Sequence, residues 1–332
     1  MVLQQRVALL VRLGKYMLSE DEIWKAVKEK AFYENGWFTP AFIELSTRNI
    51  ATHFLQEESL NAWVRKYRIP ERDTKKSNIG IVMAGNIPLV GFHDFLCAFI
   101  CGHTQTIKLS SKDTVLLKHL AEMLFVWNPS TRGLIFFAGM LKGCDAYIAT
   151  GSNHSARYFE FYFARFPHII RRNRTSVAIL NGEEEVQELS SLANDVYQYF
   201  GLGCRNVTKL YVPKGYDFVP LLNVFRKYNE LADHHKYKNN YDYQLAILIV
   251  NKLYYMTNDS VILVEDPAIF SPISRLHYEF YTDGNRVKEY LKGNPEIQSI
   301  VGKGNVPFGR AQQPSIDDFA DGVNTLQFFL EL

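Results

Sequence analysis

A cysteine between flexible glycines is the residue of this chain best suited to covalent chemistry. Cys204 lies in the segment Gly201-Leu202-Gly203-Cys204-Arg205, directly before the apolar run 207–212. Glycine lets the backbone turn sharply and present one side chain or one N–H group. Exposure and nearby positive charge both favour the thiolate, the nucleophilic form of cysteine. The alternative is a small buried cysteine after a helix, and this is the commoner outcome on local sequence alone.

The composition is that of an ordinary globular protein. Hydrophobic residues make up 47% and charged residues 22% of the chain. Its length of 332 residues is enough for about two domains. The net charge of +2 argues against a nucleic-acid-binding protein. Four cysteines do not make a disulfide framework, which predicts a reducing compartment, the cytoplasm. The apolar stretch 1–12 is too short and too charged for a signal peptide or a membrane span.

Elements that would position Cys204 begin with helices. Residues 1–67 carry apolar residues at helical spacing, with helix starts at 19–22 and 38–40, and residues 69–77 form a polar connector. Short apolar runs then alternate with helices, which predicts right-handed crossover units and a mostly parallel sheet. The predicted strands are 79–84, 105–109, 134–137, 146–149 and 176–180. Ligands of such sheets bind at the carboxyl ends of the strands, here the turns 85–88, 110–113 and 150–154.

A second α/β series contains the strand after Cys204. Its further predicted strands are 261–264, 276–280 and 297–301, and its helices are 218–231, 242–255 and 285–291. We expect the tail 326–330 to be a strand. The sequence therefore predicts an α/β fold of two doubly wound domains with a helical N-terminal lead-in.

Six short motifs stand out along residues 78–330. In chain order they are Gly85-Asn86-Ile87-Pro88, Ile107-Lys108-Leu109-Ser110-Ser111, Thr150-Gly151-Ser152, Gly201-Leu202-Gly203-Cys204, Ile269-Phe270-Ser271-Pro272 and Pro307-Phe308-Gly309. Each motif alone is weak, but their order and separations together resemble the aldehyde dehydrogenase superfamily. Within it they are most similar to the fatty-acyl-CoA reductase branch, the family of the reductase that supplies aldehyde for bacterial bioluminescence.

The resemblance implies domain roles and a catalytic pair. Residues 1–77 would be the lead-in, 78–182 a dinucleotide-binding domain, and 183–332 a catalytic cysteine domain whose last strand packs back on the first domain. Cys204 would attack an acyl carbonyl and form a thioester. The Asn86 amide and the Cys204 N–H would stabilise the oxyanion, and losing one such donor costs on the order of 100-fold in rate. An ordinary turn residue is the alternative for Asn86.

The resemblance also implies residues that bind a nicotinamide cofactor. Lys108 would hold the adenosine ribose, although a solvated lysine is common at a strand end. Ser111 stands where NAD-preferring relatives often carry a glutamate. Serine does not repel a 2′-phosphate, and Lys112 could pair with it, so we expect NADPH rather than NADH, with NADH as the alternative cofactor.

Three further positions belong to the expected cofactor site. Gly151 and Ser152 precede a helix whose N-terminus would favour a pyrophosphate, or they form an ordinary helix cap. Phe270 matches the aromatic beside the nicotinamide, although a core position is the more common role of such a residue. Ala268 departs from the family, because many relatives carry a glutamate there that binds the nicotinamide ribose.

A second departure concerns water. Hydrolytic relatives have a glutamate before the nucleophile, whereas the comparable segment here, residues 176–182, has no carboxylate. Without a positioned base, water should attack a thioester slowly, whereas a thiol such as CoA ionises near neutral pH. We therefore expect an acyl-CoA reductase that releases a fatty aldehyde. Alternatives are a non-catalytic cofactor-binding relative and an acyltransferase without the redox step. The expected partners are acyl-CoA and an aldehyde-accepting enzyme, and the expected state is a monomer or a small homo-oligomer.

The remaining polar groups are weaker candidates, and no metal site is expected. Cys97 and Cys101 lie at helical spacing on an apolar helix, which favours buried thiols over a metal pair. His234-His235 is expected to be part of a polar loop. Three arginines could meet a CoA phosphate or form a solvated basic turn: Arg171, Arg172 and Arg174.

Overall fold

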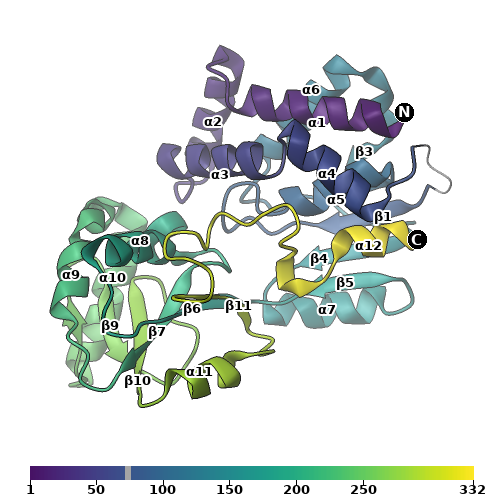
Figure 1. Cartoon of the computed structure of the whole chain (residues 1–332). Coiled ribbons are helices and arrows are strands. Elements are labelled where there is room, and N and C mark those ends of the chain that lie inside the picture. Colours follow the sequence, from purple (N-terminus) through teal and green to yellow (C-terminus); the bar gives the residue numbers. More distant parts are fainter. Residues whose placement is uncertain (72–75) are drawn as a thin grey trace. The chain divides into compact units, whose positions relative to one another are not determined.

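The computed structural model describes residues 1–71 and 76–332, and the chain divides into two compact units (Figure 1). The first unit comprises Met1–Asn173 together with Pro314–Leu332, and the second comprises Arg174–Gln313. Part of the predicted connector 69–77 lies outside the described residues. No helix in the described part of the chain is both long enough and apolar enough to cross a membrane.

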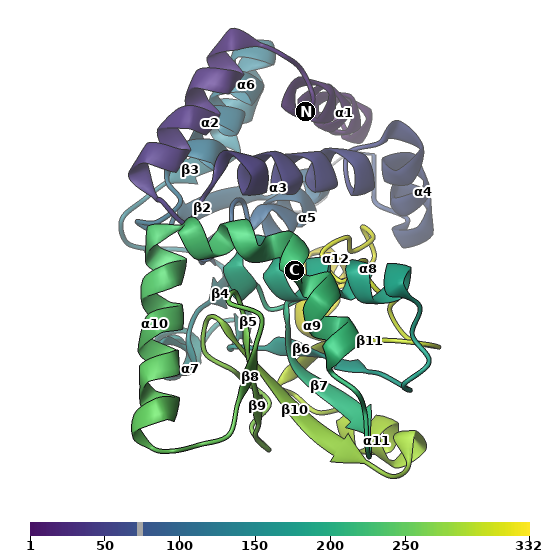
Figure 2. The ribbon, with the colours of Figure 1, turned by 90° about the vertical axis from the view of Figure 1, so that its left-hand side faces the viewer.

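The lead-in of the first unit is helical, as predicted. Asp21 caps the second helix by accepting hydrogen bonds from the N–H groups of Ile23 and Trp24, at 2.9 and 3.0 Å. Thr39 caps the third, with Pro40 in its first turn. Figure 2 shows these helices gathered together, and they share one apolar core with the first sheet. The helices are α1 (Leu3–Met17), α2 (Glu22–Glu34), α3 (Pro40–His53) and α4 (Glu57–Tyr67).

The first sheet has five parallel strands in the order β3-β2-β1-β4-β5. Helix α5 is buried on nearly every side, as its almost continuous apolar sequence predicts, and it ends at Gly102 in the left-handed conformation. The expected alternation of strands and helices is confirmed. The elements are β1 (Asn78–Val82), α5 (Phe92–Cys101), β2 (Thr104–Lys108), α6 (Val115–Trp127), η1 (Pro129–Gly133), β3 (Ile135–Phe137), β4 (Ala146–Thr150), α7 (Asn153–Phe163) and β5 (His168–Arg171).

Strand β5 corrects the interpretation of the basic run at 171–174. Arg171 is neither solvated nor open to a phosphate, because it is buried, forms an ion pair with Asp94, and donates to Thr325 Oγ1 at 2.7 Å. Arg172 is exposed and pairs with Glu160 at 2.5 Å. The sequence does not reveal this strand, because β5 has only four residues and Arg171 is the last of them.

The expected tail strand at 326–330 is wrong. These residues lie in helix α12 (Thr325–Leu330), which follows the short η4 (Ala320–Gly322). Asn324 caps α12 by accepting from the N–H of Gln327 at 2.9 Å, and a short apolar run alone does not distinguish a helix from a strand. The tail does return to the first unit, where His103 Nε2 lies 2.9 Å from the Phe329 carbonyl oxygen.

The second unit contains a six-stranded sheet in the order β11-β6-β7-β10-β9-β8, parallel except for the β8–β9 pair. The sequence assigns residues 176–180 to the end of the first series of strands, whereas β6 pairs with β7 and β11 of this sheet. The predicted boundary after residue 182 therefore falls inside the second unit. The elements are β6 (Thr175–Ile179), α8 (Val186–Tyr197), η2 (Gln198–Gly201), β7 (Val207–Pro213), α9 (Val219–Phe225), η3 (Arg226–Asp233), α10 (His235–Val250), β8 (Met256–Thr257), β9 (Ile262–Glu265), β10 (Arg275–Tyr281), α11 (Gly284–Leu291) and β11 (Ile297–Val301).

Alternate residues of β6 face opposite sides of the second sheet. Ala178 packs in the core that includes α8, whereas Val177 and Ile179 pack in the core that includes Leu291 of α11. Helices α8 and α11 therefore cover opposite faces of one parallel sheet, as Figure 1 shows. This is the doubly wound arrangement that the sequence predicts.

Candidate active site

The loop that carries Cys204 follows a sharp reversal of the chain. Tyr199, Phe200 and Gly201 all have positive φ, at 54°, 57° and 74°. This conformation costs a non-glycine residue about 1–2 kcal/mol, so packing must hold it. Both aromatic side chains are buried, and the Phe200 ring lies 4.5 Å from that of His234. Cys204 itself is half-buried, which corrects the alternative of a fully buried cysteine.

Asn206 fastens this loop to the preceding helix. Its Nδ2 donates to the carbonyl oxygens of Gln198 and Asp195, at 2.8 and 3.0 Å, and its Oδ1 accepts from the N–H of Gly203 at 2.8 Å. Asn206 is fully buried, so these bonds satisfy groups that water cannot reach. The side chain of Asn206, two residues after Cys204, therefore binds backbone groups that precede Cys204 in the chain.

Strand β6 supports the same loop from another direction. Ser176 Oγ donates to the Cys204 carbonyl oxygen at 3.2 Å and lies 2.8 Å from Ser299 Oγ. Thr175 Oγ1 donates to the Asn206 carbonyl oxygen at 3.2 Å. The segment where hydrolytic relatives carry their glutamate is therefore a buried strand whose hydroxyl groups bind the backbone of the cysteine loop.

Asp195 connects the Cys204 loop to a second loop of the same unit. Its carboxylate accepts hydrogen bonds from the N–H groups of Gly309 and Ala311, at 2.6 and 3.0 Å. Burial raises the pKa of the Asp195 carboxyl to about 7, against the opposing effect of these two donors. The motif Pro307-Phe308-Gly309 is thus attached to the helix that leads into the cysteine loop.

Phe270 is half-buried against the core that includes Ile179, Tyr211 and Leu291. The backbone before it is held by side chains of β7 and β10. The contacts are Lys209 Nζ to the Pro267 carbonyl oxygen at 2.7 Å, His277 Nδ1 to that of Ala268 at 3.0 Å, and Thr208 Oγ1 to that of Ile269 at 2.8 Å. Three consecutive carbonyl oxygens are therefore fixed, which orients the aromatic side chain that follows them.

Two of these supporting residues face each other across neighbouring strands. Lys209 and His277 are direct partners in the β7–β10 register, and both are buried. Lys209 Nζ also contacts Glu279 Oε2 at 2.6 Å, and burial lowers the pKa of His277. Sequence reasoning did not find them, although a lysine inside the apolar strand 207–213 was a usable signal for a buried ion pair.

In the first unit, Asn86 lies in the turn between β1 and α5 and is half-buried. This turn packs against the one after β2, because a Cβ atom on Gly85 would lie 2.7 Å from both Cβ and Oγ of Ser110. Asp113 Oδ2 accepts from the N–H of Leu89 at 2.8 Å, where the chain has a φ of 56°. Burial raises the pKa of Asp113 to about 6. A buried carboxyl therefore holds the far end of the Asn86 turn.

Lys108 and Ser111 lie at the carboxyl end of β2, beside this turn. Both are exposed, and so is Lys112, while Asp113 is turned inward. Residues 108–112 contain two lysines and no carboxylate. The exposed surface of this turn is therefore suited to an anionic group such as a phosphate.

Gly151 and Ser152 lie at the carboxyl end of β4, next to β1. Ser152 Oγ accepts from the N–H of Ser155 at 3.2 Å, so the serine is the cap of α7. A Cβ atom on Gly151 would lie 3.0 Å from Phe159 Cε2 and Ser155 Cβ, which is a close approach of the loop to the helix. The structure thus brings Asn86, Lys108, Ser111, Gly151 and Ser152 to one edge of the first sheet, and Cys204 and Phe270 belong to the second unit.

The weaker candidates have structural roles. Cys97 and Cys101 are buried on α5, and burial raises the pKa of Cys97 well above its usual value. His234 caps α10 by accepting from the N–H of Tyr237 at 3.4 Å. Among the residues that the structure describes, no three His, Cys, Asp or Glu side chains lie together as a metal site.

Solved structures share this architecture over most of the chain. An aldehyde dehydrogenase 21 from Physcomitrella patens, in complex with the reaction product succinate, has a TM-score of 0.65 and 13% identity, covering 91% of this chain and 74% of its own. A NAD-dependent benzaldehyde dehydrogenase from Corynebacterium glutamicum has the same score and identity, covering 91% and 76%. The chain has the aldehyde dehydrogenase fold.

A third example of the aldehyde dehydrogenase fold, from Mycobacterium tuberculosis and complexed with NAD+, has a TM-score of 0.62 and 15% identity, covering 88% of this chain and 71% of its own. No protein-family model and no curated protein sequence matches the chain. The expected superfamily fold is therefore confirmed at the level of structure, and the reductase branch remains a prediction from the motifs.

Proposed function

We propose that this protein is an NADPH-dependent acyl-CoA reductase that carries the acyl group on Cys204 and releases a fatty aldehyde. The observation that supports the proposal best is the half-buried Cys204 on a loop fastened by Asn206 and Ser176. A nucleophile needs a fixed position more than a general exposure, because misplacement by about 1 Å can cost on the order of 100-fold in rate. The supporting bonds supply that fixed position.

In the first step, the Cys204 thiolate attacks the carbonyl carbon of acyl-CoA. A new C–S bond forms, the carbonyl oxygen becomes an oxyanion, and the CoA thiolate leaves when the carbonyl re-forms. We assign the oxyanion donors by resemblance to the Cys204 N–H and the Asn86 side-chain amide. Asp113 would act as a positioning residue for Asn86, because it holds the Leu89 N–H at the end of the same turn.

The thioester must then resist water. Residues 175–182 supply hydroxyl and amide groups but no carboxylate, so this segment offers no general base. The hydroxyl of Ser176 donates to the Cys204 carbonyl oxygen, and a neutral alcohol is too weak a base to take a proton from water. The thioester would therefore persist until a thiol such as CoA, or a hydride from the bound cofactor, reacts with it.

The edge of the first sheet fits a phosphate-bearing cofactor. Gly85 lets two loops approach closely, and Lys108 and Lys112 are exposed cations. Helix α7 follows its cap Ser152 and begins with N–H groups that lack partners within the helix. We propose that these residues hold NADPH, with Phe270 beside the nicotinamide. The bound cofactor would supply the hydride that turns the thioester into an aldehyde and returns the Cys204 thiolate.

The test is a search for the acyl-enzyme in the absence of NADPH. The full chain is incubated with acyl-CoAs of short, medium and long chain, and intact mass and hydroxylamine sensitivity are measured. We expect one acyl group per chain, lost in Cys204→Ala and Cys204→Ser and retained in the matched control Cys144→Ala. Adding NADPH should discharge the acyl group as aldehyde.

Two outcomes would overturn parts of the proposal. No adduct with any chain length would exclude the covalent step and favour a non-catalytic relative. An adduct that passes to another acceptor but gives no aldehyde with either NADPH or NADH would exclude the reduction and favour an acyltransferase.

A further inference from the structure

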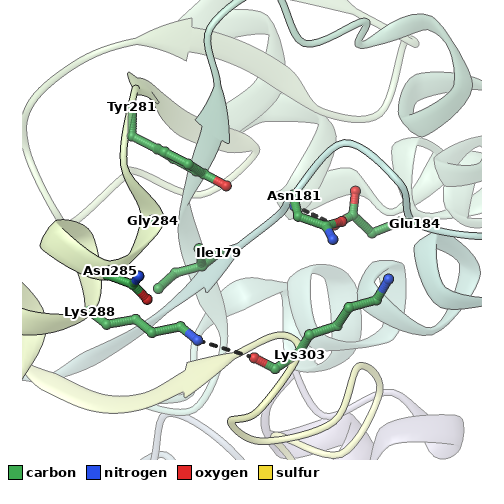
Figure 3. Close-up of a pocket in the computed structure, with 8 residues that line it drawn as sticks. All are labelled: Ile179, Asn181, Glu184, Tyr281, Gly284, Asn285, Lys288 and Lys303. Carbon is green, nitrogen blue, oxygen red and sulfur yellow. Dashed lines mark hydrogen bonds between the residues drawn. The ribbon is translucent and has the colours of Figure 1, made fainter.

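A cavity of about 260 Å³ lies in the second unit, away from the residues assigned above (Figure 3). Its lining residues lie at the carboxyl ends of β6 and β10 or follow the ends of β6, β10 and β11. Cys204 precedes the amino end of β7, which runs parallel to these strands. The cavity and Cys204 are therefore at opposite ends of one parallel sheet.

The position of the cavity is the one where doubly wound sheets bind ligands. The strand order reverses at β6, since β7 pairs on one side of it and β11 on the other. The chain leaves β6 for α8 on one face and leaves β10 for α11 on the other face. Such a reversal leaves a crevice outside the carboxyl ends of the strands. Asn181 and Glu184 come from the loop after β6, and Lys303 from the loop after β11.

Glycines let these loops approach each other. A Cβ atom on Gly302 would lie 2.5 Å from the Ile179 carbonyl oxygen, and Gly302 has a φ of 140°. Gly182, in the loop after β6, has a φ of 87°. Other residues resist both conformations, so the backbone around the cavity needs glycine at these two positions.

The charges at the cavity favour an anion. Lys288 and Lys303 both line it, and Figure 3 shows their side chains across the cavity from the Tyr281 ring. The carboxylate of Glu184 already accepts from the N–H groups of Asn181 and Gly182, at 2.6 and 3.2 Å, and the two lysines outnumber this one carboxylate. Lysine binds phosphate as a point charge, and two ammonium groups at one small cavity suit a dianion.

The remaining lining and the size decide the kind of anion. Ile179 and the Tyr281 ring supply an apolar wall, and the Tyr281 hydroxyl is fixed by donating to the Leu180 carbonyl oxygen at 2.6 Å. The volume is below the roughly 300–1,000 Å³ of sites for drug-sized ligands, which favours a ligand smaller than a dinucleotide or a whole CoA. We propose that this cavity binds a small phosphate monoester of the size of a sugar phosphate, with the phosphate on Lys288 and Lys303.

The proposal does not depend on the reductase activity and is tested by calorimetry on the full chain. The probes are ribose 5-phosphate, ribose and inorganic phosphate. We expect saturable binding of one ribose 5-phosphate, weaker binding of inorganic phosphate, and none of ribose. Lys288→Met and Lys303→Met should each weaken ribose 5-phosphate binding about tenfold, the effect of losing one charged hydrogen bond.

Lys292→Met is the matched control, because Lys292 is exposed, follows directly after the last residue of α11 and does not line the cavity. Lys288→Arg should retain most of the binding, which separates lost charge from a damaged fold. Absence of ribose 5-phosphate binding, or equal binding by the Lys292 and Lys288 methionine variants, would overturn the site. Acylation of Cys204 measured in the Lys288→Met variant keeps this result distinct from the proposed function.

Discussion

Asp195 and Asn206 are joined by a hydrogen bond of 3.0 Å from the asparagine Nδ2 to the aspartate carbonyl oxygen. The same aspartate binds the N–H groups of Gly309 and Ala311 through its carboxylate. One helical residue thus connects the Cys204 loop to the Pro307-Phe308-Gly309 loop. We therefore expect substitutions at Asp195 or Asn206 to change the reactivity of Cys204 indirectly, through the loop that carries it.

Replacing Asn206 with alanine should impair both stability and acylation. The change leaves the Gln198 carbonyl oxygen and the Gly203 N–H without this partner in a buried place, which costs about 1–3 kcal/mol for each group left unsatisfied. We expect a clear loss of unfolding free energy in urea and a fall of at least about tenfold in the acylation rate. Asn223→Ala, at an exposed position, is the control and should change neither quantity. A normal acylation rate in Asn206→Ala would show that the loop needs no such fastening.

The pH dependence of stability should change in Asp195→Asn. The pKa of Asp195 is raised to about 7 in the folded chain, above its ordinary value near 4, so the folded state holds the proton more tightly than the unfolded state. Its contribution to stability is therefore complete below about pH 4 and is lost as the pH rises through about 7, at up to 1.4 kcal/mol per pH unit. Urea unfolding between pH 5 and 8 should show a smaller decline in the asparagine variant. Asp242→Asn, at an exposed site, should keep the wild-type slope, and equal slopes in all three proteins would contradict the assignment.

Gly85→Ala should weaken cofactor binding. The new Cβ atom would lie 2.7 Å from Ser110 Cβ and Oγ, so the two loops at the edge of the first sheet must separate. We expect the dissociation constant of NADPH, measured by fluorescence titration, to rise at least about tenfold. Ser110→Gly in the same chain should restore part of the loss. Gly139→Ala, where the added atom meets nothing within 4 Å, should bind NADPH normally.

Ser111→Glu should reverse the expected cofactor preference. A carboxylate at this exposed position would repel a 2′-phosphate, and Lys112→Ala would remove a cation that can pair with it. In both variants the ratio of kcat/KM for NADPH to that for NADH should fall, by about tenfold or more for the glutamate. A wild-type protein that prefers NADH would remove the basis of this prediction.

The sequence predicted the parts of the fold that local patterns control. Short apolar runs located the strands that contain Ile81, Ile107 and Ile148, and the glycines around Cys204 located the loop. It did not show that the strand of Val177 joins the second sheet, because periodicity says nothing about which neighbour a strand pairs with. It also predicted a strand at Leu326 and its neighbours, because a short apolar run fits a helix as well as a strand.

The site was predicted less completely than the fold. Cys204, Asn86 and the loops of the first sheet follow from motifs of consecutive residues. Asp195 and Lys209 act through partners 114 and 58 residues away along the chain, and no local pattern predicts such contacts. A polar residue inside an apolar helix or strand was the available signal. It predicts that a buried hydrogen-bonding partner exists but does not identify that partner.

The return of residues 314–332 to the first unit has a consequence for synthesis of the chain. The second unit is one uninterrupted segment inserted between two parts of the first. As the ribosome emits the chain from its amino end, residues 174–313 can fold as soon as they emerge. The first unit includes α12, so it can be completed only after the second unit has emerged.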